Sequence, residues 1–158
     1  QKLLDGLRIF YQLSSIIENT TNQRRSLMSN SPDEFVYRAT LDRIVDGDTF
    51  DCILDLGFDV KLHKQRVRLA GIDTPESRTR NLEEKALGLK AKDRLIELCV
   101  GSFKIQSLGK GKYGRILGIP YTEDGKDICQ MLIEEGHAVE YWGGKKTARV
   151  KEDGSWGE

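Results

Sequence analysis

Cysteine and histidine are scarce in this chain, which has three cysteines and two histidines among 158 residues. Cys52, Cys99 and Cys129 are widely spaced, odd in number and form no CxxC pair. This pattern excludes a disulfide framework and the common zinc sites, and it is typical of small core residues in a reducing compartment. His63 and His137 have no partner at metal-ligand spacing, so we expect both to be structural or solvated.

A long apolar run is also absent. No window of the sequence is apolar over the length needed to cross a bilayer, and the first stretch mixes charged residues with apolar ones, unlike a secretory signal. We therefore expect no membrane partner. The cytoplasm is the favoured compartment, and secretion is the alternative if a signal precedes the given sequence.

Net charge is the third absence, because 25 Lys and Arg balance 25 Asp and Glu. A neutral average argues against a polyanionic partner, but the charges are unevenly distributed. Residues 61–68 (KLHKQRVR) and 104–115 (KIQSLGKGKYGR) each carry four Lys or Arg and no acid. Local basic segments, rather than net charge, decide whether phosphate can dock.

The residues from 34 onward alternate between apolar and polar side chains, as strands do. Strands are predicted at 35–45, 49–56, 59–72, 102–108 and 115–122, with helices at 81–99 and 127–136. Five strands with a helix between the third and fourth match an OB-type barrel, a fold whose face commonly binds nucleic acid. The predicted fold class is α+β: a five-stranded OB-fold β-barrel with two to three helices plus an N-terminal helix. We place this domain at 34–146 and expect 147–158 to be an irregular tail.

The N-terminal segment 1–33 is predicted to be an appendage of that domain. Its apolar positions recur at spacings of three and four from Leu3 to Ile17, which indicates an amphipathic helix followed by a polar linker. We expect this helix to cover part of the barrel or to form a homodimer or partner contact. A linker to a further domain is the alternative.

Two short acidic motifs follow or precede predicted strands. VDGDTF (45–50) is most often a tight hairpin turn, and GIDTPE (71–76) is most often a capped turn. Asp48 and Asp73 both lie at strand ends, so the alternative is that they converge on a hard cation, which prefers oxygen ligands. A proline-stiffened loop would hold Glu76 beside that metal, where a carboxylate deprotonates or orients water.

Two arginines are predicted to lie next to these acids. Arg68 precedes GIDTPE, and Arg115 ends the motif KYGR, which on its own predicts a turn with a packed tyrosine. Guanidinium groups bind phosphate through paired, charge-assisted hydrogen bonds and remain charged. Together with a dication they would stabilise the negative charge that a phosphodiester gains in its five-coordinate transition state.

The ordered motifs VDGDTF, VRLAGIDTPE, KYGRILG and MLIEEGHA resemble the staphylococcal nuclease (thermonuclease) family. The resemblance runs from about Thr40 to Trp142, and the ending EGHAVEYWGGKK is similar to phage and bacterial members. The sequence departs from the family pattern at its C-terminal end, where no third helix is predicted. Tyr141 or Trp142 is the candidate for stacking on a nucleotide.

This resemblance implies a calcium site, with another divalent ion as the alternative. It assigns the metal ligands to the carboxylates of Asp48 and Asp73 and to the backbone carbonyl of Thr74, and it places Asp46 beside them. The resemblance further implies a catalytic role for three side chains: Glu76 activates or orients the attacking water, and Arg68 and Arg115 bind the phosphate. It also implies that Lys112 and Tyr113 contact a terminal phosphate.

The leading functional hypothesis is a calcium-dependent endonuclease acting on DNA or RNA. By resemblance, the broken bond is P–O5′ and the products carry 3′-phosphate ends. The alternative is a non-catalytic OB-fold module that binds nucleic acid or protein, which would be expected to lack part of the acid and arginine set. A structural protein whose helix recruits a partner is a third interpretation, and it predicts no metal dependence.

Overall fold

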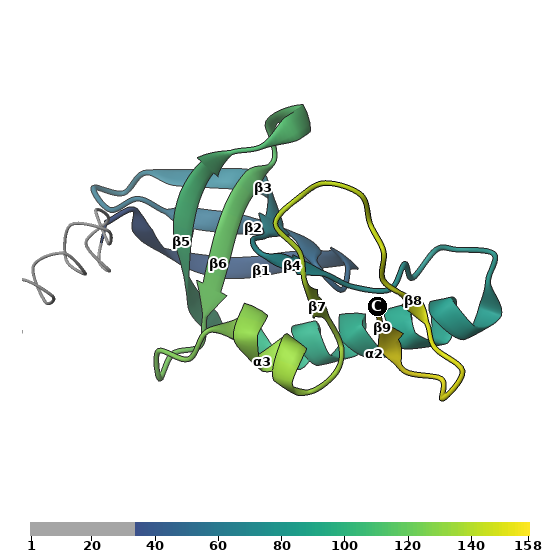
Figure 1. The fold of residues 1–158 in the computed structure, drawn as a ribbon. Coiled ribbons are helices and arrows are strands. Elements are labelled where there is room, and N and C mark those ends of the chain that lie inside the picture. Colours follow the sequence, from purple (N-terminus) through teal and green to yellow (C-terminus); the bar gives the residue numbers. More distant parts are fainter. Residues whose placement is uncertain (1–33) are drawn as a thin grey trace, which may run out of the picture. The chain divides into compact units, whose positions relative to one another are not determined.

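The computed structural model describes residues 34–158, in which Phe35–Glu158 form one compact unit (Figure 1). The strands are β1 (Val36–Asp46), β2 (Thr49–Asp55), β3 (Lys61–Leu69), β4 (Ile72–Asp73), β5 (Ser102–Lys110), β6 (Ile116–Tyr121), β7 (Val139–Glu140), β8 (Arg149–Val150) and β9 (Trp156–Gly157). The helices are α2 (Leu82–Leu98), α3 (Ile128–Glu134) and the short 3-10 turn η1 (Lys112–Gly114). None of these helices is both long and apolar enough to cross a membrane. The predicted N-terminal helix and its contacts lie outside the described residues.

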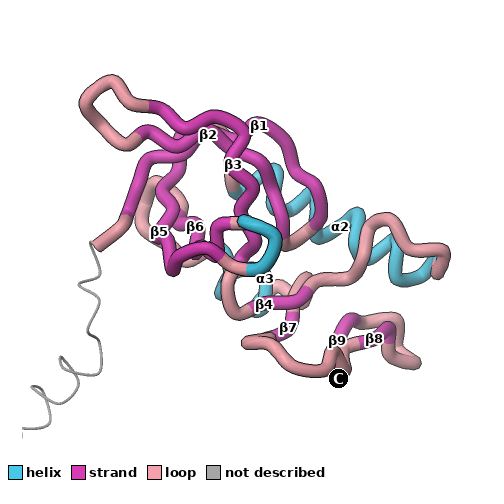
Figure 2. Tube along the Cα trace, turned by 90° about the horizontal axis from the view of Figure 1, so that it is seen from above, coloured by secondary structure: helices cyan, strands magenta, loops and turns pink. Residues whose placement is uncertain are grey.

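Five strands form a closed barrel in the order β1-β2-β3-β6-β5, which Figure 2 shows from above. β1 closes the barrel by pairing with β5, while β3 and β6 run parallel. α2 connects β3 and β4 to β5, so it lies between the third and fourth barrel strands in sequence, as predicted. The predicted α+β fold with an OB-type barrel is confirmed.

The core fills the barrel and extends to the two helices. Phe50 of β2 and Phe103 of β5 meet edge to face, with ring centroids 5.6 Å apart. Leu95 of α2 and Leu132 of α3 are fully buried against the same core. The three cysteines are buried and unpaired, as their spacing predicted. The helices therefore close the barrel by burying apolar faces, and the site residues are built on this rigid frame.

The third strand is shorter than predicted. β3 ends at Leu69, and Gly71 adopts a positive φ of 72° in the turn that follows. The chain then leaves the barrel, and Ile72 and Asp73 pair as β4 with β7 instead. The prediction of one strand over 59–72 is wrong because this glycine turn, which only a residue without a Cβ adopts easily, redirects the chain.

The C-terminal tail is not irregular throughout, contrary to expectation. β8 and β9 form a short antiparallel hairpin that lies near α2 in Figure 1. Gly154 has a φ of 78°, and the Ser155 backbone N–H is held by the Asp153 carboxylate at 2.9 Å. Turn chemistry at Asp153–Ser155 therefore determines this hairpin, and two-residue strands are too short to show alternation. No helix follows α3 in the described residues, as expected.

Candidate active site

One cleft of about 490 Å³ gathers six of the predicted site residues. These six are Asp46, Asp48, Arg68, Glu76, Lys112 and Arg115. The cleft is further lined by Thr49, Tyr141, Gly143, Gly144 and Lys146. The lining residues come from the β1–β2 turn, the end of β3, the loop after β4, η1 and the segment after β7. Five separate segments therefore meet at this end of the barrel.

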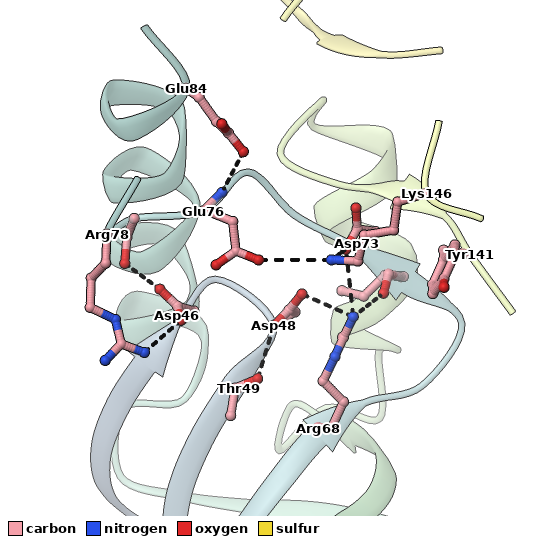
Figure 3. Close-up of polar contacts among 12 residues, drawn as sticks. Asp46, Asp48, Thr49, Arg68, Asp73, Glu76, Arg78, Glu84, Tyr141 and Lys146 are labelled. Carbon is pink, nitrogen blue, oxygen red and sulfur yellow. Dashed lines mark hydrogen bonds and ion pairs between the residues drawn. The ribbon is translucent and has the colours of Figure 1, made fainter. Parts of the chain in front are cut away.

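Arg68 is the central cation of the cleft. Its Nη2 atom lies 3.0 Å from Asp48 Oδ2 and 3.7 Å from Asp73 Oδ1 (Figure 3). Its Nη1 and Nη2 groups also donate hydrogen bonds to the backbone carbonyls of Leu69 and Ile72, each at 3.0 Å. A guanidinium has five N–H groups, so these contacts fix its plane and leave N–H groups for a ligand. The side chain is 17% exposed, which makes it accessible from the cleft.

Asp48 and Asp73 together offer oxygen ligands of the kind that a hard cation prefers. Both residues are buried, with exposed fractions of 8% and 2%, and both approach the same nitrogen of Arg68. Thr49 Oγ1 donates to Asp48 Oδ1 at 2.9 Å, which orients that carboxylate. Thr74, the third predicted ligand, follows Asp73 in the sequence and is also buried. Arg68 and Lys146 balance the charge of these buried carboxylates, and the oxygen donors themselves are of the type that a divalent ion binds.

The protein supplies few anionic ligands to such an ion. Within residues 34–158, no group of three or more His, Cys, Asp or Glu side chains is placed to hold a metal. The predicted ligands, two carboxylates and a backbone carbonyl, would leave several coordination positions open. Calcium accepts carbonyl and water oxygens at such positions, and an open position is what a substrate phosphate needs.

Glu76 and Lys146 face each other across the cleft in Figure 3. Lys146 Nζ lies 2.5 Å from Asp73 Oδ1 and 3.8 Å from Glu76 Oε1. Partial burial raises the pKa of Glu76; Lys146 opposes that rise, and the neighbouring Asp46, Asp48 and Asp73 carboxylates add to it. The Glu76 side chain nevertheless remains 56% exposed, so solvent reaches its carboxylate. A carboxylate that water reaches and whose proton affinity is raised is suited to accept a proton.

Asp46 anchors the loop that carries Glu76. The Ser77 hydroxyl donates to Asp46 Oδ1, and Arg78 Nη2 lies 3.0 Å from Asp46 Oδ2. Burial alone would raise the pKa of Asp46, but these hydrogen bonds and the Arg78 charge outweigh it, so the pKa is lowered. Asp46 is therefore held as a charged group that ties the β1–β2 turn to the loop after β4, at the two residues that follow Glu76.

Two glycines allow these segments to approach α2. A Cβ on Gly47 would lie 2.8 Å from Ala91 Cβ, and a Cβ on Gly88 would lie 2.7 Å from the carbonyl carbon of Glu76. Non-bonded carbon atoms do not approach that closely, so any larger residue at either position would displace one motif. Gly88 weakens the helix in which it lies. Its place in α2 is explained by the close passage of the Glu76 backbone.

The KYGR motif forms the η1 turn at the edge of the cleft. Tyr113 has a positive φ of 61° and is 93% exposed, and the Arg115 guanidinium lies 5.8 Å from the centre of its ring. Arg115 Nε donates to the Lys112 carbonyl at 3.4 Å. Lys112 lines the site cleft, whereas Tyr113 lines a neighbouring cleft instead. The structure thus brings Arg115 and Lys112 to the predicted site and leaves Tyr113 beside it.

Lys146 and Tyr141 are cleft residues to which no catalytic function was predicted. Lys146 Nζ lies 6.0 Å from the centre of the Tyr141 ring, and the Tyr141 hydroxyl donates to the Gly144 carbonyl at 2.8 Å. Trp142 is 70% exposed and lines a separate pocket with Gly71. Tyr141, one of the two predicted stacking candidates, is therefore the one that lines the site. The only sequence feature that pointed to Lys146 was the basic GGKK stretch. Its distance in sequence from the acidic motifs gave no way to predict that they would meet.

Comparison with known proteins identifies the family of this chain. The sequence model described as "Staphylococcal nuclease homologue" matches residues 66–154. Three curated relatives are the endonuclease YncB and the SPbeta prophage-derived endonuclease YokF of Bacillus subtilis, and a micrococcal nuclease of Shigella flexneri. They are 36%, 40% and 34% identical over 125, 104 and 122 residues, respectively.

These alignments cover 76%, 63% and 70% of this chain and 56%, 32% and 63% of the respective relatives. The chain therefore spans between about a third and two thirds of the length of the relatives it matches. The family match covers more than half of the 158 residues and includes the stretches that carry Arg68, Asp73, Glu76 and Arg115. This chain belongs to the staphylococcal nuclease homologue family.

Proposed function

We propose that this chain is a divalent-metal-dependent nuclease that hydrolyses phosphodiester bonds of DNA or RNA. The observation that carries the proposal is the single cleft that holds Glu76, Arg68 and Arg115 above the buried pair Asp48 and Asp73. A base, two phosphate-binding cations and a hard-cation donor set are the groups that water attack on phosphorus requires. The names of the relatives, two endonucleases and a micrococcal nuclease, support the same class of activity.

The metal would be held by Asp48, Asp73 and the backbone carbonyl of Thr74. These hard oxygen donors suit a divalent ion, and calcium is the ion that the family resemblance implies. When bound, the ion supplies positive charge to the phosphate and to the water beside it. Both carboxylates are buried and lie close to cationic side chains, so they are preorganised for a cation rather than free to rotate.

The side chains of the cleft account for the remaining chemistry. Glu76 takes a proton from the attacking water as the oxygen forms its bond to phosphorus. Arg68 and Arg115 donate hydrogen bonds to the phosphoryl oxygens, whose negative charge grows in the transition state. The P–O5′ bond then breaks, the sugar oxygen leaves with its electron pair and takes up a proton, and the 3′-phosphate remains. A non-catalytic binding module would need no such pairing of a base with two arginines.

The proposed activity predicts cleavage that depends on a divalent ion. We expect single-stranded DNA, double-stranded DNA or RNA to be cut in calcium and to stay intact in excess chelator, because without the cation the buried carboxylates would repel the phosphate. Gel analysis of end-labelled substrates measures this directly. The products should be poor primers for a polymerase until a phosphatase removes the 3′-phosphate. Cleavage that is indifferent to chelator, or no cleavage in calcium, magnesium or manganese, would contradict the proposal.

Lys146 should compete with the metal for Asp73. Its ammonium lies 2.5 Å from Asp73 Oδ1, so a dication at this carboxylate would repel it or displace it. Replacing Lys146 with methionine keeps the chain length and removes the charge. We expect calcium to bind Lys146→Met about tenfold more tightly, equivalent to about 1.4 kcal/mol, as measured by titration calorimetry.

The matched control is Lys145→Met, which removes the same charge one residue away. Lys145 is exposed and forms no ion pair with any described residue, so its replacement should leave calcium affinity nearly unchanged. Calcium affinity that is unchanged or weaker in Lys146→Met would show that Lys146 supports the metal site rather than competing for it.

A further inference from the structure

Two clefts beside the active site form a continuous basic surface. The larger, of about 740 Å³, is lined by Arg43, Arg66 and Arg115 among others, and Arg115 also lines the active-site cleft. The smaller, of about 290 Å³, shares Arg43 and Arg66 with the larger. Because each cleft shares lining residues with the next, the three clefts are contiguous. A polymer strand that leaves the active-site cleft past Arg115 would pass over the larger and then the smaller of the other two clefts.

The charge of these two clefts is unbalanced. The smaller cleft is lined by Arg43, Arg66, Arg78 and Lys92 and by no acid. The larger adds the cations Lys64 and Arg115 and has two lining acids, Asp42 and Asp51. We call the five residues Arg43, Lys64, Arg66, Arg78 and Lys92 the basic track. Although the net charge of the protein is zero, cationic side chains cluster next to the active-site cleft.

Asp51 holds two of the arginines in place rather than neutralising the surface. Arg66 donates to both Asp51 oxygens, at 2.7 and 2.9 Å, and Arg43 Nε donates to Oδ2 at 2.8 Å. The hydrogen bond from Arg66 is the main cause that lowers the pKa of Asp51 to about 2, so this carboxylate stays charged. Asp51 is buried, whereas the side chains of Arg43 and Arg66 are 65% and 43% exposed. Their remaining N–H groups face solvent in a fixed arrangement.

A bulge in β3 directs a further cation into the larger cleft. Cys52 pairs with Gln65 and Leu54 with Leu62, so His63 and Lys64 oppose the single residue Ile53. Lys64 has a positive φ of 53°, which is unusual for a residue with a side chain. Bulges re-aim side chains next to functional sites. Within residues 34–158, neither Lys64 nor Lys92 forms an ion pair.

We propose that the basic track binds the phosphodiester backbone of the substrate strand outside the active-site cleft. This inference rests on the proposed nuclease function, because the polyanion that reaches Arg115 there is a nucleic acid. Fixed guanidiniums and unpaired lysines along a groove are the features that bind a strand through its phosphates without reading its bases. The track therefore makes cleavage favour long strands over short ones and makes affinity fall as salt rises.

The test removes two track lysines and compares them with two others of the same elements. Lys64→Ala with Lys92→Ala alters β3 and α2 within the track. Lys61→Ala with Lys90→Ala removes the same charge from the same strand and helix, at exposed positions that line neither cleft. None of the four lysines lies in the proposed catalytic machinery. Melting followed by circular dichroism verifies folding, and glutamine replaces alanine in any variant that melts early.

The first readout is binding without cleavage. A fluorescent single-stranded oligonucleotide about 20 nucleotides long is titrated in chelator and followed by anisotropy. We expect the track variant to bind on the order of tenfold more weakly than the control variant at low salt. Its slope of log affinity against log salt should be shallower by about 1.4, because each lost phosphate contact on a single strand contributes about 0.7.

The second readout is kcat/KM in calcium for the long oligonucleotide and for a dinucleotide. The track variant should lose activity on the long strand and keep it on the dinucleotide, which is too short to leave the cleft. If the two double variants bind the oligonucleotide equally and show the same length preference, the proposal that the basic track binds the substrate strand is wrong. Track-dependent binding in a protein that cuts nothing would instead overturn the proposed nuclease function and leave the track standing.

Discussion

Replacing Arg115 with alanine is expected to lower kcat by about 10²–10³-fold with little change in melting temperature. Arg115 makes few structural contacts: a long hydrogen bond of 3.4 Å from its Nε to the Lys112 carbonyl and a ring contact with Tyr113. Its remaining N–H groups are free for a phosphate, so their loss should affect the transition state rather than the fold. Arg68 is less suitable for this test, because it is bound to Asp48 and to two backbone carbonyls.

The measurement is single-turnover cleavage of a labelled oligonucleotide at saturating calcium, with melting followed in parallel. Arg38→Ala is the matched control, because Arg38 is an exposed arginine on β1 that does not line the active-site cleft. Arg115→Lys should recover only part of the rate, since an ammonium cannot make the paired hydrogen bonds of a guanidinium. An alanine variant that melts early but turns over normally per folded molecule would identify Arg115 as structural.

Replacing Glu76 with glutamine is expected to lower kcat by about 10²–10⁴-fold, the usual contribution of a general base. Glutamine has the same shape but cannot accept the proton of the attacking water. Glu76 is 56% exposed and its ion pair with Lys146 is long, at 3.8 Å. Stability should therefore change by less than about 0.5 kcal/mol, as for most surface substitutions.

Calcium affinity separates the proposed roles of Glu76 and the metal ligands. Because Glu76 is not among the proposed ligands, titration calorimetry should give Glu76→Gln nearly the affinity of the unaltered chain. Asp73→Asn should lose most of its calcium binding in the same assay. Glu83→Gln removes an exposed carboxylate from the first turn of α2 and is the matched control for charge. Wild-type turnover in Glu76→Gln would remove this residue from the mechanism.

The acidic motifs show how far local sequence can lead. Asp73 and Glu76 are three positions apart at a strand end, so their proximity was predictable: Asp73 ends β4, and Glu76 lies in the loop that follows, with Lys146 near both. Asp46 was expected beside the predicted ligands; in the structure it lines the cleft with Asp48 and contacts Ser77 and Arg78. The sequence did not show those two partners, because the contacts span residues 46 to 78 and depend on how the turn packs.

Lys146 shows what local sequence missed, whereas Arg68 was predicted to lie next to the acids. The turn at Gly71 and the pairing of β4 with β7 bring Asp73 within 3.7 Å of Arg68. Lys146 is more than seventy positions from Asp73 in sequence and nevertheless lies 2.5 Å from it. A contact between residues so far apart produces no recognisable pattern in the sequence, because it depends on the path of the segment after β7.

Alternation and ordered motifs were sufficient to predict an OB-type barrel and the helix between its third and fourth strands, and they pointed to the residues from which the candidate site is proposed. These features are local, because strand period and turn propensity act over a few residues. Tertiary structure decided which distant groups meet. Examples are the contact of Lys146 with Asp73, the close approach of Gly88 to the Glu76 backbone, and the basic track beside Arg115. The physical reason is that barrel closure and strand register set the distances between segments, and neither is encoded in any one segment.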